Sequence, residues 1–196
     1  MSNEITVRIK CSLDEMYNIL KNKGFNIVDK YNLEDIYYIK RDCDVKKQQI
    51  SKLLERYILI RKITQFVPSE FKDSCNINLL VLKNKDIALD GTIKNQQKKE
   101  CEIQSIEQGK EFIEALGYKQ LIVIREKTLV YGKGELKLAI KDIENGENLI
   151  EIETVENFPE LDSIEKIKQK INELQIPIDT NDYFVKKAEI ELKKIL

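Results

Sequence analysis

Four stretches of the sequence place charged side chains at alternating positions within aliphatic runs. They are residues 4–10 (EITVRIK), 98–102 (KKECE), 123–127 (VIREK) and 150–153 (IEIE). Successive side chains of a β-strand point to opposite faces of its sheet, so each stretch, as a strand, gathers its charges on one face. Several such strands in one sheet predict a surface or a lumen lined with both carboxylates and cations.

The composition limits the chemistry that such a surface can carry. The 196 residues include no histidine, which excludes a histidine general base, a Ser-His-Asp triad and histidine-ligated zinc. The cysteines, Cys11, Cys43, Cys75 and Cys101, are far apart, and we expect them to be reduced and mostly buried. Any catalysis by this chain must therefore use carboxylates, lysine, tyrosine or a hard metal ion.

The overall charge excludes some classes of partner. The 33 basic and 34 acidic residues nearly cancel, so no overall field favours nucleic acid or an anionic membrane. No apolar run approaches the length that spans a bilayer, and the N-terminal residues do not resemble a signal peptide. We expect a cytoplasmic protein that binds neither nucleic acid nor membrane, as a monomer or a homodimer.

The remaining pattern predicts one α+β domain over residues 1–196. Ser12 and Glu15 form a capping box at the start of a helix, and Asn145-Gly146 favours a hairpin between the last two strands. Strands are expected at 4–10, 27–28, 36–39, 57–61, 77–83, 98–104, 119–131, 135–143 and 148–155. Helices are expected at 12–23, 44–52, 105–116, 161–174 and 183–196, with a loop at 68–76. Few of these strands form βαβ units, which favours an antiparallel sheet or barrel.

Glutamates at alternate positions are candidates for binding a hard cation. Two carboxylates at i and i+2 lie roughly 6.6–6.8 Å apart along a strand, and they repel one another unless a cation lies between them. Mg²⁺ takes oxygen ligands and keeps several waters, so pairs such as Glu151 and Glu153 can flank it. A metal together with Arg and Lys is a general arrangement for binding polyphosphate. The alternative is a solvated sheet face without a ligand.

A series of short motifs follows one order along almost the whole chain. They are Glu4-Ile5-Thr6-Val7-Arg8, Gly24-Phe25, Asp35-Ile36-Tyr37-Tyr38, Ile58-Leu59-Ile60-Arg61, Lys83, Lys98-Lys99-Glu100-Cys101-Glu102, Val123-Ile124-Arg125, Glu151-Ile152-Glu153 and Asp182-Tyr183. In this order they resemble the CYTH superfamily, the triphosphate tunnel metalloenzymes. That superfamily includes class IV adenylyl cyclases, thiamine triphosphatases and tripolyphosphatases.

The resemblance implies a closed eight-stranded antiparallel β-barrel, with helices packed outside and a charged tunnel inside. In such a tunnel glutamates hold Mg²⁺ or Mn²⁺, and the implied metal ligands are Glu4, Glu100, Glu102, Glu151 and Glu153. The residues implied to bind the substrate, a polyphosphate or a nucleoside triphosphate, are Arg8, Lys10, Arg61, Lys83, Lys98 and Arg125. The implied catalytic residues are Glu4, Arg8, Arg125 and Glu151.

Four positions depart from the family pattern. Thr6 replaces the second glutamate of the opening motif, Leu59 the first arginine of the third strand, Val123 the lysine of K-x-R, and Lys141 an aspartate. Losing two carboxylates and two cations lowers the expected affinity for metal and for phosphate. Lys141 could instead act as a fixed cation that takes part of a metal's electrostatic role.

The resemblance leaves several functions open. The first is divalent-metal-dependent hydrolysis of a triphosphate. Thr6 and Lys141 leave a second metal site short of carboxylate ligands, which favours hydrolysis over cyclisation. The alternatives are class IV adenylyl cyclase activity, or a catalytically weakened tunnel that binds a nucleotide or polyphosphate as a sensor. A scaffold with a charged face and no ligand is the remaining alternative.

Overall fold

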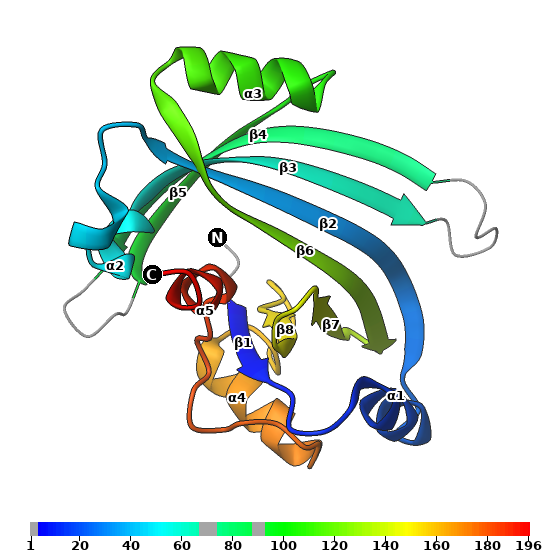
Figure 1. Cartoon of the computed structure of the whole chain (residues 1–196). Helices are drawn as coiled ribbons and strands as arrows, with labels where there is room; N and C mark the ends of the chain where they lie inside the picture. The colour runs from blue at the N-terminus through cyan, green and yellow to red at the C-terminus, as the bar shows by residue number, and fades with distance from the viewer. Residues whose placement is uncertain (1–3, 67–73, 88–92) are drawn as a thin grey trace. The chain divides into compact units, whose positions relative to one another are not determined.

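The computed structural model describes residues 4–66, 74–87 and 93–196 (Figure 1). The strands are β1 (Glu4–Arg8), β2 (Asn26–Lys40), β3 (Arg56–Phe66), β4 (Ser74–Ile87), β5 (Ile93–Glu102), β6 (Tyr118–Lys133), β7 (Leu136–Ile143) and β8 (Asn148–Glu153). The helices are α1 (Leu13–Asn22), α2 (Ile50–Leu53), α3 (Ile106–Ala115), α4 (Ile164–Glu173) and α5 (Lys187–Lys193), with a 3-10 turn at Val45–Lys47. Most of the loop expected at 68–76 lies outside the described residues, and its last three residues belong to β4.

The eight strands form one sheet in the order β1-β8-β7-β6-β2-β3-β4-β5. The pairs β1–β8, β8–β7, β7–β6 and β4–β5 are antiparallel, so the predicted α+β class with an antiparallel sheet is confirmed. Asn145 adopts the left-handed backbone conformation (φ 56°) in the hairpin between β7 and β8, as the Asn-Gly signal predicts. None of the helices in the described ranges is both long and apolar enough to cross a membrane.

The closed barrel is not confirmed, because within the described residues the strand order ends at β1 and β5. The edge of β1 that faces away from β8 pairs with the chain at 177–185. The Thr6 N–H donates to the Tyr183 carbonyl (2.9 Å), and the Val185 N–H donates to the Thr6 carbonyl (3.0 Å). Further along, the Asp179 N–H donates to the Arg8 carbonyl (2.9 Å). These backbone groups of β1 are therefore already satisfied by the C-terminal segment.

The same pairing shortens the last helix. A helix was expected over 183–196, but α5 spans only Lys187–Lys193. Residues 183–185 cannot be helical because their backbone groups bond to Thr6. The expectation that the cysteines are mostly buried is also wrong, since Cys75 and Cys101 are exposed on β4 and β5, and Cys11 and Cys43 are half-buried.

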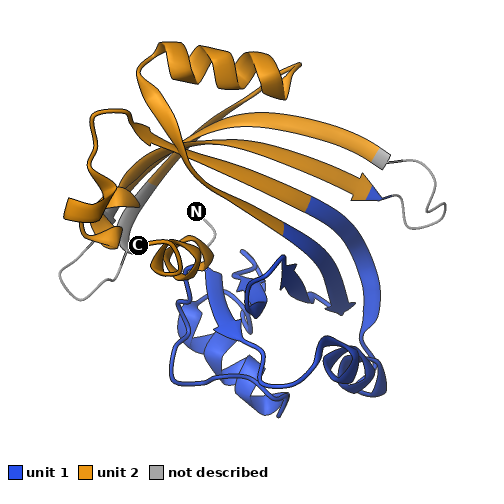
Figure 2. Ribbon diagram, in the orientation of Figure 1, with its two compact units in different colours: residues 1–32, 66–74, 126–186 blue, residues 33–65, 75–125, 187–196 orange. Residues whose placement is uncertain are grey.

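The chain divides into two compact units (Figure 2). Unit 1 comprises residues 1–32, 66–74 and 126–186, and unit 2 comprises residues 33–65, 75–125 and 187–196. Strands β2 and β6 each contribute to both units. The prediction of one domain over 1–196 stays a prediction.

Unit 1 buries one face of its strands under helices. Ser12 caps α1 by accepting a hydrogen bond from the Glu15 N–H (3.2 Å), as the capping box predicts. The buried cluster includes Ile5, Val7, Met16, Leu20, Leu138, Ile140, Ile150, Ile152, Ile167 and Ile171, which come from β1, β7, β8, α1 and α4. Because strand side chains alternate, Glu4, Thr6 and Arg8 lie on the opposite face of β1.

Unit 2 repeats this division with α3 as the covering helix. Ile36, Tyr38, Ile60 and Ile113 form its buried cluster, and Ile58, Leu80 and Val123 pack against it. The helix lies close to the sheet at Gly109, where a Cβ atom would come within 2.7 Å of the Ile103 Cδ1 atom. Alternation then directs Asp35, Arg61 and Lys83 to the face that α3 does not cover. The charged positions therefore face away from α1 and α4 in unit 1 and away from α3 in unit 2.

Candidate active site

Three glutamates of unit 1 form an acidic group on the strand face that the helices leave uncovered. In the pairing of β1 with β8, Glu4 lies opposite Glu153, and Thr6 lies opposite Glu151. Carboxylate oxygens of Glu4, Glu151 and Glu153 all lie within 4.8 Å of one another. Oxygens on opposite sides of a bound Mg²⁺ would be about 4.2 Å apart, so the group fits a hard divalent ion after a small side-chain shift. The structure thus brings together three of the predicted metal ligands.

A buried lysine of unit 1 lies beside this acidic group. The Lys141 Nζ atom lies 2.6 Å from Glu151 Oε2 and 3.8 Å from Glu126 Oε1. The side chains of Lys141 and Glu126 are 8% and 0% exposed. The Thr128 hydroxyl lies 3.5 Å from Glu126 Oε1 and is its hydrogen-bond donor. A fixed ammonium among these carboxylates agrees with the electrostatic role suggested for Lys141 by the sequence.

The charges of this cluster affect the pKa of Tyr31. Burial raises the pKa of its hydroxyl, and Lys141 offsets only part of that effect, while Glu151 and Glu126 reinforce it. Tyr31 therefore stays neutral at physiological pH. Neither Tyr31 nor Glu126 was a predicted site residue. Glu126 has charged neighbours on both sides in the sequence, so alternation alone could not single it out.

The two predicted cations at the end of β1 are engaged by carboxylates from later in the chain. Arg8 donates from Nε to Glu147 Oε2 (2.6 Å) and from an Nη atom to Asp182 Oδ2 (3.2 Å). Burial lowers the pKa of Arg8, but the hydrogen bonds that Arg8 donates to Glu147 and Asp182, together with the charges of these carboxylates, outweigh burial and raise the pKa, so the guanidinium stays charged. Lys10 Nζ lies 3.2 Å from Asp179 Oδ1. A phosphate bound by Arg8 or Lys10 must therefore compete with these carboxylates.

Unit 2 holds a carboxylate between two cations. Asp35 is fully buried, and Arg61 donates to both of its oxygens, from Nε (2.7 Å) and Nη2 (2.8 Å). Lys187, the first residue of α5, donates to Asp35 Oδ2 (3.0 Å). Burial raises the pKa of Asp35, but Lys187 and Arg61 outweigh burial and lower the pKa to about 2. One carboxylate thus holds one guanidinium and one ammonium group.

A further pair of cations of unit 2 lies across β4 and β5. Lys83 is opposite Lys98 in the register, and Glu100 is opposite Val81. Like charges opposite one another repel, and an acidic partner relieves part of that repulsion. The Lys98 Nζ atom also lies 2.5 Å from Glu100 Oε2. Among the described residues, Glu100 and Glu102 belong to no group of three close carboxylates, so the structure does not join them to the other predicted metal ligands.

Arg125 lies apart from the other predicted cations of unit 2. Its Nε atom donates to the Glu34 carboxylate, and its side chain is 56% exposed. Glu34 precedes Asp35 on β2, so the two carboxylates point to opposite faces of the sheet. Val123, two residues before Arg125, packs against the α3 cluster. The structure therefore places Arg125 on the helix-covered face, and it does not bring Arg125 together with Arg61.

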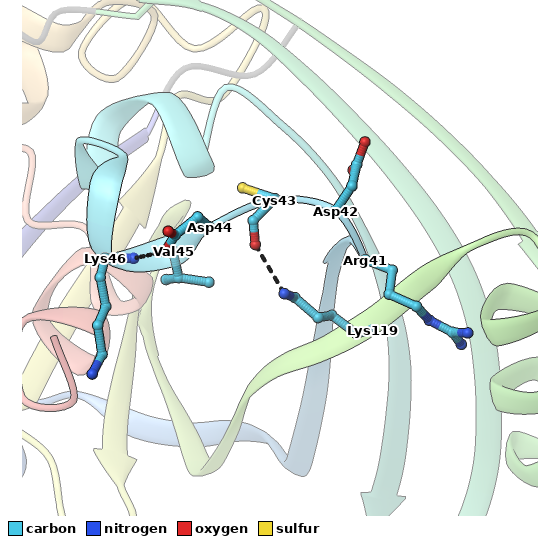
Figure 3. Close-up of a pocket in the computed structure, with 7 residues that line it drawn as sticks. All are labelled: Arg41, Asp42, Cys43, Asp44, Val45, Lys46 and Lys119. Carbon is cyan, nitrogen blue, oxygen red and sulfur yellow. Dashed lines mark hydrogen bonds between the residues drawn. The ribbon is translucent and has the colours of Figure 1, made fainter.

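A shallow cavity of about 440 Å³ lies elsewhere in unit 2, where β2 ends (Figure 3). Its lining residues are Arg41, Asp42, Cys43, Asp44, Val45, Lys46 and Lys119. Lys119 donates a hydrogen bond to the Cys43 carbonyl (2.8 Å), which ties β6 to the turn after β2. The predicted site residues do not line this cavity.

Comparison with known proteins gives a fold and no sequence family. No protein-family model matches the chain, and no curated protein matches it. A protein of Pyrococcus horikoshii shares 21% identity and a TM-score of 0.66, with 99% of each chain covered. A proposed adenylate cyclase from Vibrio parahaemolyticus shares 12% identity and a TM-score of 0.59, over 98% of this chain and 97% of that one.

The third structure is a proposed adenylyl cyclase from Hippeastrum that has a dominant triphosphatase activity. It shares 15% identity and a TM-score of 0.59, over 99% of this chain and 96% of its own. At such identities the likeness shows the fold. Each of the three structures shares the fold of this chain over 98–99% of its length.

Proposed function

We propose that this protein hydrolyses a linear triphosphate, inorganic or organic, with Mg²⁺ or Mn²⁺ as cofactor. The observation that carries the proposal is the group of Glu4, Glu151 and Glu153 on adjacent strands, with oxygens within 4.8 Å. Its support comes from the order of charged motifs along the chain and from the fold shared with the Hippeastrum protein. Thr6 and Lys141 replace two carboxylates of the family pattern, so a second metal site has few ligands. This favours hydrolysis over cyclisation.

Catalysis of phosphoryl transfer rests on positioning and on neutralising the charge of the transferred group. A divalent ion held by Glu4, Glu151 and Glu153 would neutralise charge on the phosphoryl oxygens. Arg8 supplies a permanent cation on the same face of β1, and Lys10 follows it. Binding of phosphate would exchange their carboxylate partners, Glu147, Asp182 and Asp179, for phosphate oxygens.

We propose Arg61, Lys83 and Lys98 as phosphate-binding residues of unit 2, and we add Lys187, which shares Asp35 with Arg61. The roles implied for Glu100, Glu102 and Arg125 stay predictions. Each of these residues is tested by its own neutral variant in one assay of turnover. A residue whose variant retains turnover and substrate affinity is removed from the proposed site.

The decisive assay incubates the purified chain with tripolyphosphate, thiamine triphosphate or ATP, each with Mg²⁺ or Mn²⁺. Phosphate, pyrophosphate and cyclic AMP are measured as products. We expect phosphate release that needs the metal and falls about 10²-fold or more in the double variant Glu151→Gln/Glu153→Gln, because removal of preorganised charge at a reacting phosphate has effects of that order. Glu135→Gln, an exposed residue between β6 and β7, is the matched control and should retain the activity.

Other outcomes identify the alternatives. Cyclic AMP and pyrophosphate from ATP would replace hydrolysis by class IV adenylyl cyclase activity. A rise in melting temperature with a triphosphate, without any product, would indicate a sensor, because a ligand that binds only the folded state stabilises it. The sensor is favoured by one observation: Thr6 lies opposite Glu151, so β1 offers no second carboxylate at that pair.

A further inference from the structure

Lys141 occupies an unusual position for a lysine side chain. It belongs to β7, the strand between β6 and β8, and its ammonium group contacts Glu126 of β6 and Glu151 of β8. With an exposed fraction of 8%, it has little contact with water. A buried ammonium is stable only when carboxylates or other acceptors pair with it, and here two carboxylates do so.

The same carboxylates connect Lys141 to the acidic group. Glu151 accepts a hydrogen bond from Lys141 at 2.6 Å, and its carboxylate also lies within 4.8 Å of Glu4 and Glu153. Glu126 and Glu151 therefore contact the Lys141 ammonium, and Glu4 and Glu153 lie beside Glu151. Four carboxylates carry enough formal charge to balance two divalent ions. The Lys141 ammonium neutralises part of that charge.

We propose that the Lys141 ammonium permanently takes the place of a second divalent cation, so that the acidic group of unit 1 binds one metal ion. The inference rests on the proposed function, and it makes Lys141 a positioning residue that acts through Glu151. A second ion on the Glu126 side of Glu151 would lie beside the ammonium, and the two cations would repel one another strongly in so dry an environment. The single ion is thus confined to the side of Glu4 and Glu153.

The test counts ions with Mn²⁺ alone, by isothermal titration and by the electron paramagnetic resonance signal of free Mn²⁺. We expect one Mn²⁺ per chain for the wild-type protein and for Lys141→Arg, which keeps the charge. We expect two Mn²⁺ per chain for Lys141→Met, which keeps the length of the side chain and removes the charge. Lys137→Met is the matched control, since Lys137 is an exposed lysine of the same strand, and it should bind one ion.

Melting temperature provides the second readout. Lys141→Met leaves Glu126 and Glu151 without their ammonium, so we expect it to melt below the wild type in chelator and to gain more from Mn²⁺ than the wild type gains. Two ions in the wild type, or one ion in a folded Lys141→Met variant, would overturn the proposal. Two Mn²⁺ ions in the wild type would overturn the proposal even if the Lys141→Met variant failed to fold.

The outcome also separates this inference from the proposed function. A wild type that binds one Mn²⁺ and hydrolyses a triphosphate, with Lys141→Met also binding one ion, contradicts the role of Lys141 alone. A wild type that binds no Mn²⁺ and yields no product contradicts both.

Discussion

Unit 1 and unit 2 each bury one charged side chain between two partners of the opposite sign, and the sign of the buried charge differs between the units. In unit 1, the buried Lys141 lies between two glutamates. In unit 2, the buried Asp35 lies between an arginine and a lysine. Each unit therefore carries one buried charge between two partners of the opposite sign, on the strand face away from α1 and α4 in unit 1 and away from α3 in unit 2. This difference supports the proposal that unit 1 binds a cation and that unit 2 binds phosphate.

The largest expected effect comes from breaking the centre of unit 2. Asp35→Asn leaves Arg61 and Lys187 largely buried without their carboxylate, at 18% and 16% exposure. Removing one partner of a buried ion pair typically costs about 3–5 kcal/mol, so we expect a loss of that size in the free energy of unfolding. Urea denaturation followed by circular dichroism measures it. An Asp35→Asn protein as stable as the wild type would show that the three charges do not depend on one another.

The corresponding change in unit 1 is expected to be smaller and to respond to metal. Lys141→Met removes the ammonium beside the buried Glu126, but Glu151 is 20% exposed and keeps part of its hydration. We expect a loss of about 3 kcal/mol in chelator, much of it recovered with Mn²⁺, because a ligand at one hundred times its Kd stabilises by about 2.7 kcal/mol. Denaturation of both variants with and without Mn²⁺ tests the contrast. Equal recovery of Asp35→Asn by Mn²⁺ would contradict the assignment of opposite preferences to the two units.

The stability of unit 2 is expected to depend on pH through Asp35. Asp35 has a pKa of about 2 in the folded protein against an ordinary value of 3.8, so its ionised form is favoured by folding. The resulting stabilisation is complete above about pH 4 and is lost as the pH falls from about 4 to about 2, with a total of roughly 2 kcal/mol. The free energy of unfolding at pH 5, 3 and 2 should fall more steeply for the wild type than for Asp35→Asn. Parallel pH profiles for the two proteins would contradict the low pKa.

The smallest effect is expected where the pair is exposed. Glu34 and Arg125 form an ion pair on the helix-covered face, with 30% and 56% of their side chains exposed. Such pairs contribute about 0–1 kcal/mol, so Glu34→Gln should change the free energy of unfolding by no more than that. Glu34→Gln is also the neighbouring control for Asp35→Asn. The turnover of Arg125→Ala then decides whether the catalytic role implied by the resemblance holds in spite of this placement.

Much of the fold could be predicted because local signals and tertiary packing agree. Ser12 and Ser105 cap helices where expected, and the charges of residues 4–8 and 150–153 lie on one face as alternation requires. The last helix could not be predicted correctly, because hydrogen bonds of residues 183–185 with β1 override a helical pattern. Such pairing joins segments more than 170 residues apart, and no local pattern encodes it.

The candidate site was predictable only where charges alternate cleanly. The carboxylates of Glu4, Glu151 and Glu153 were found, since each lies among uncharged neighbours. In β6, residues 125–127 are all charged, so the sequence leaves open which of them faces the uncovered side. A shift of one residue exchanges the faces of a strand, and the structure places Glu126 there, against Lys141, instead of Arg125.

The pairing of β1 has a consequence for the order in which the molecule is assembled. β1 is synthesised before its hydrogen-bonding partners, which are β8 and residues 177–185. On the ribosome, one edge of this strand stays unpaired until β8 has been made, and the other until residues 177–185 have been made. Contacts over such sequence separations close slowly, so we expect the formation of unit 1 to limit the rate of folding. Until then, β1 remains an open strand edge to which another copy of the chain can add.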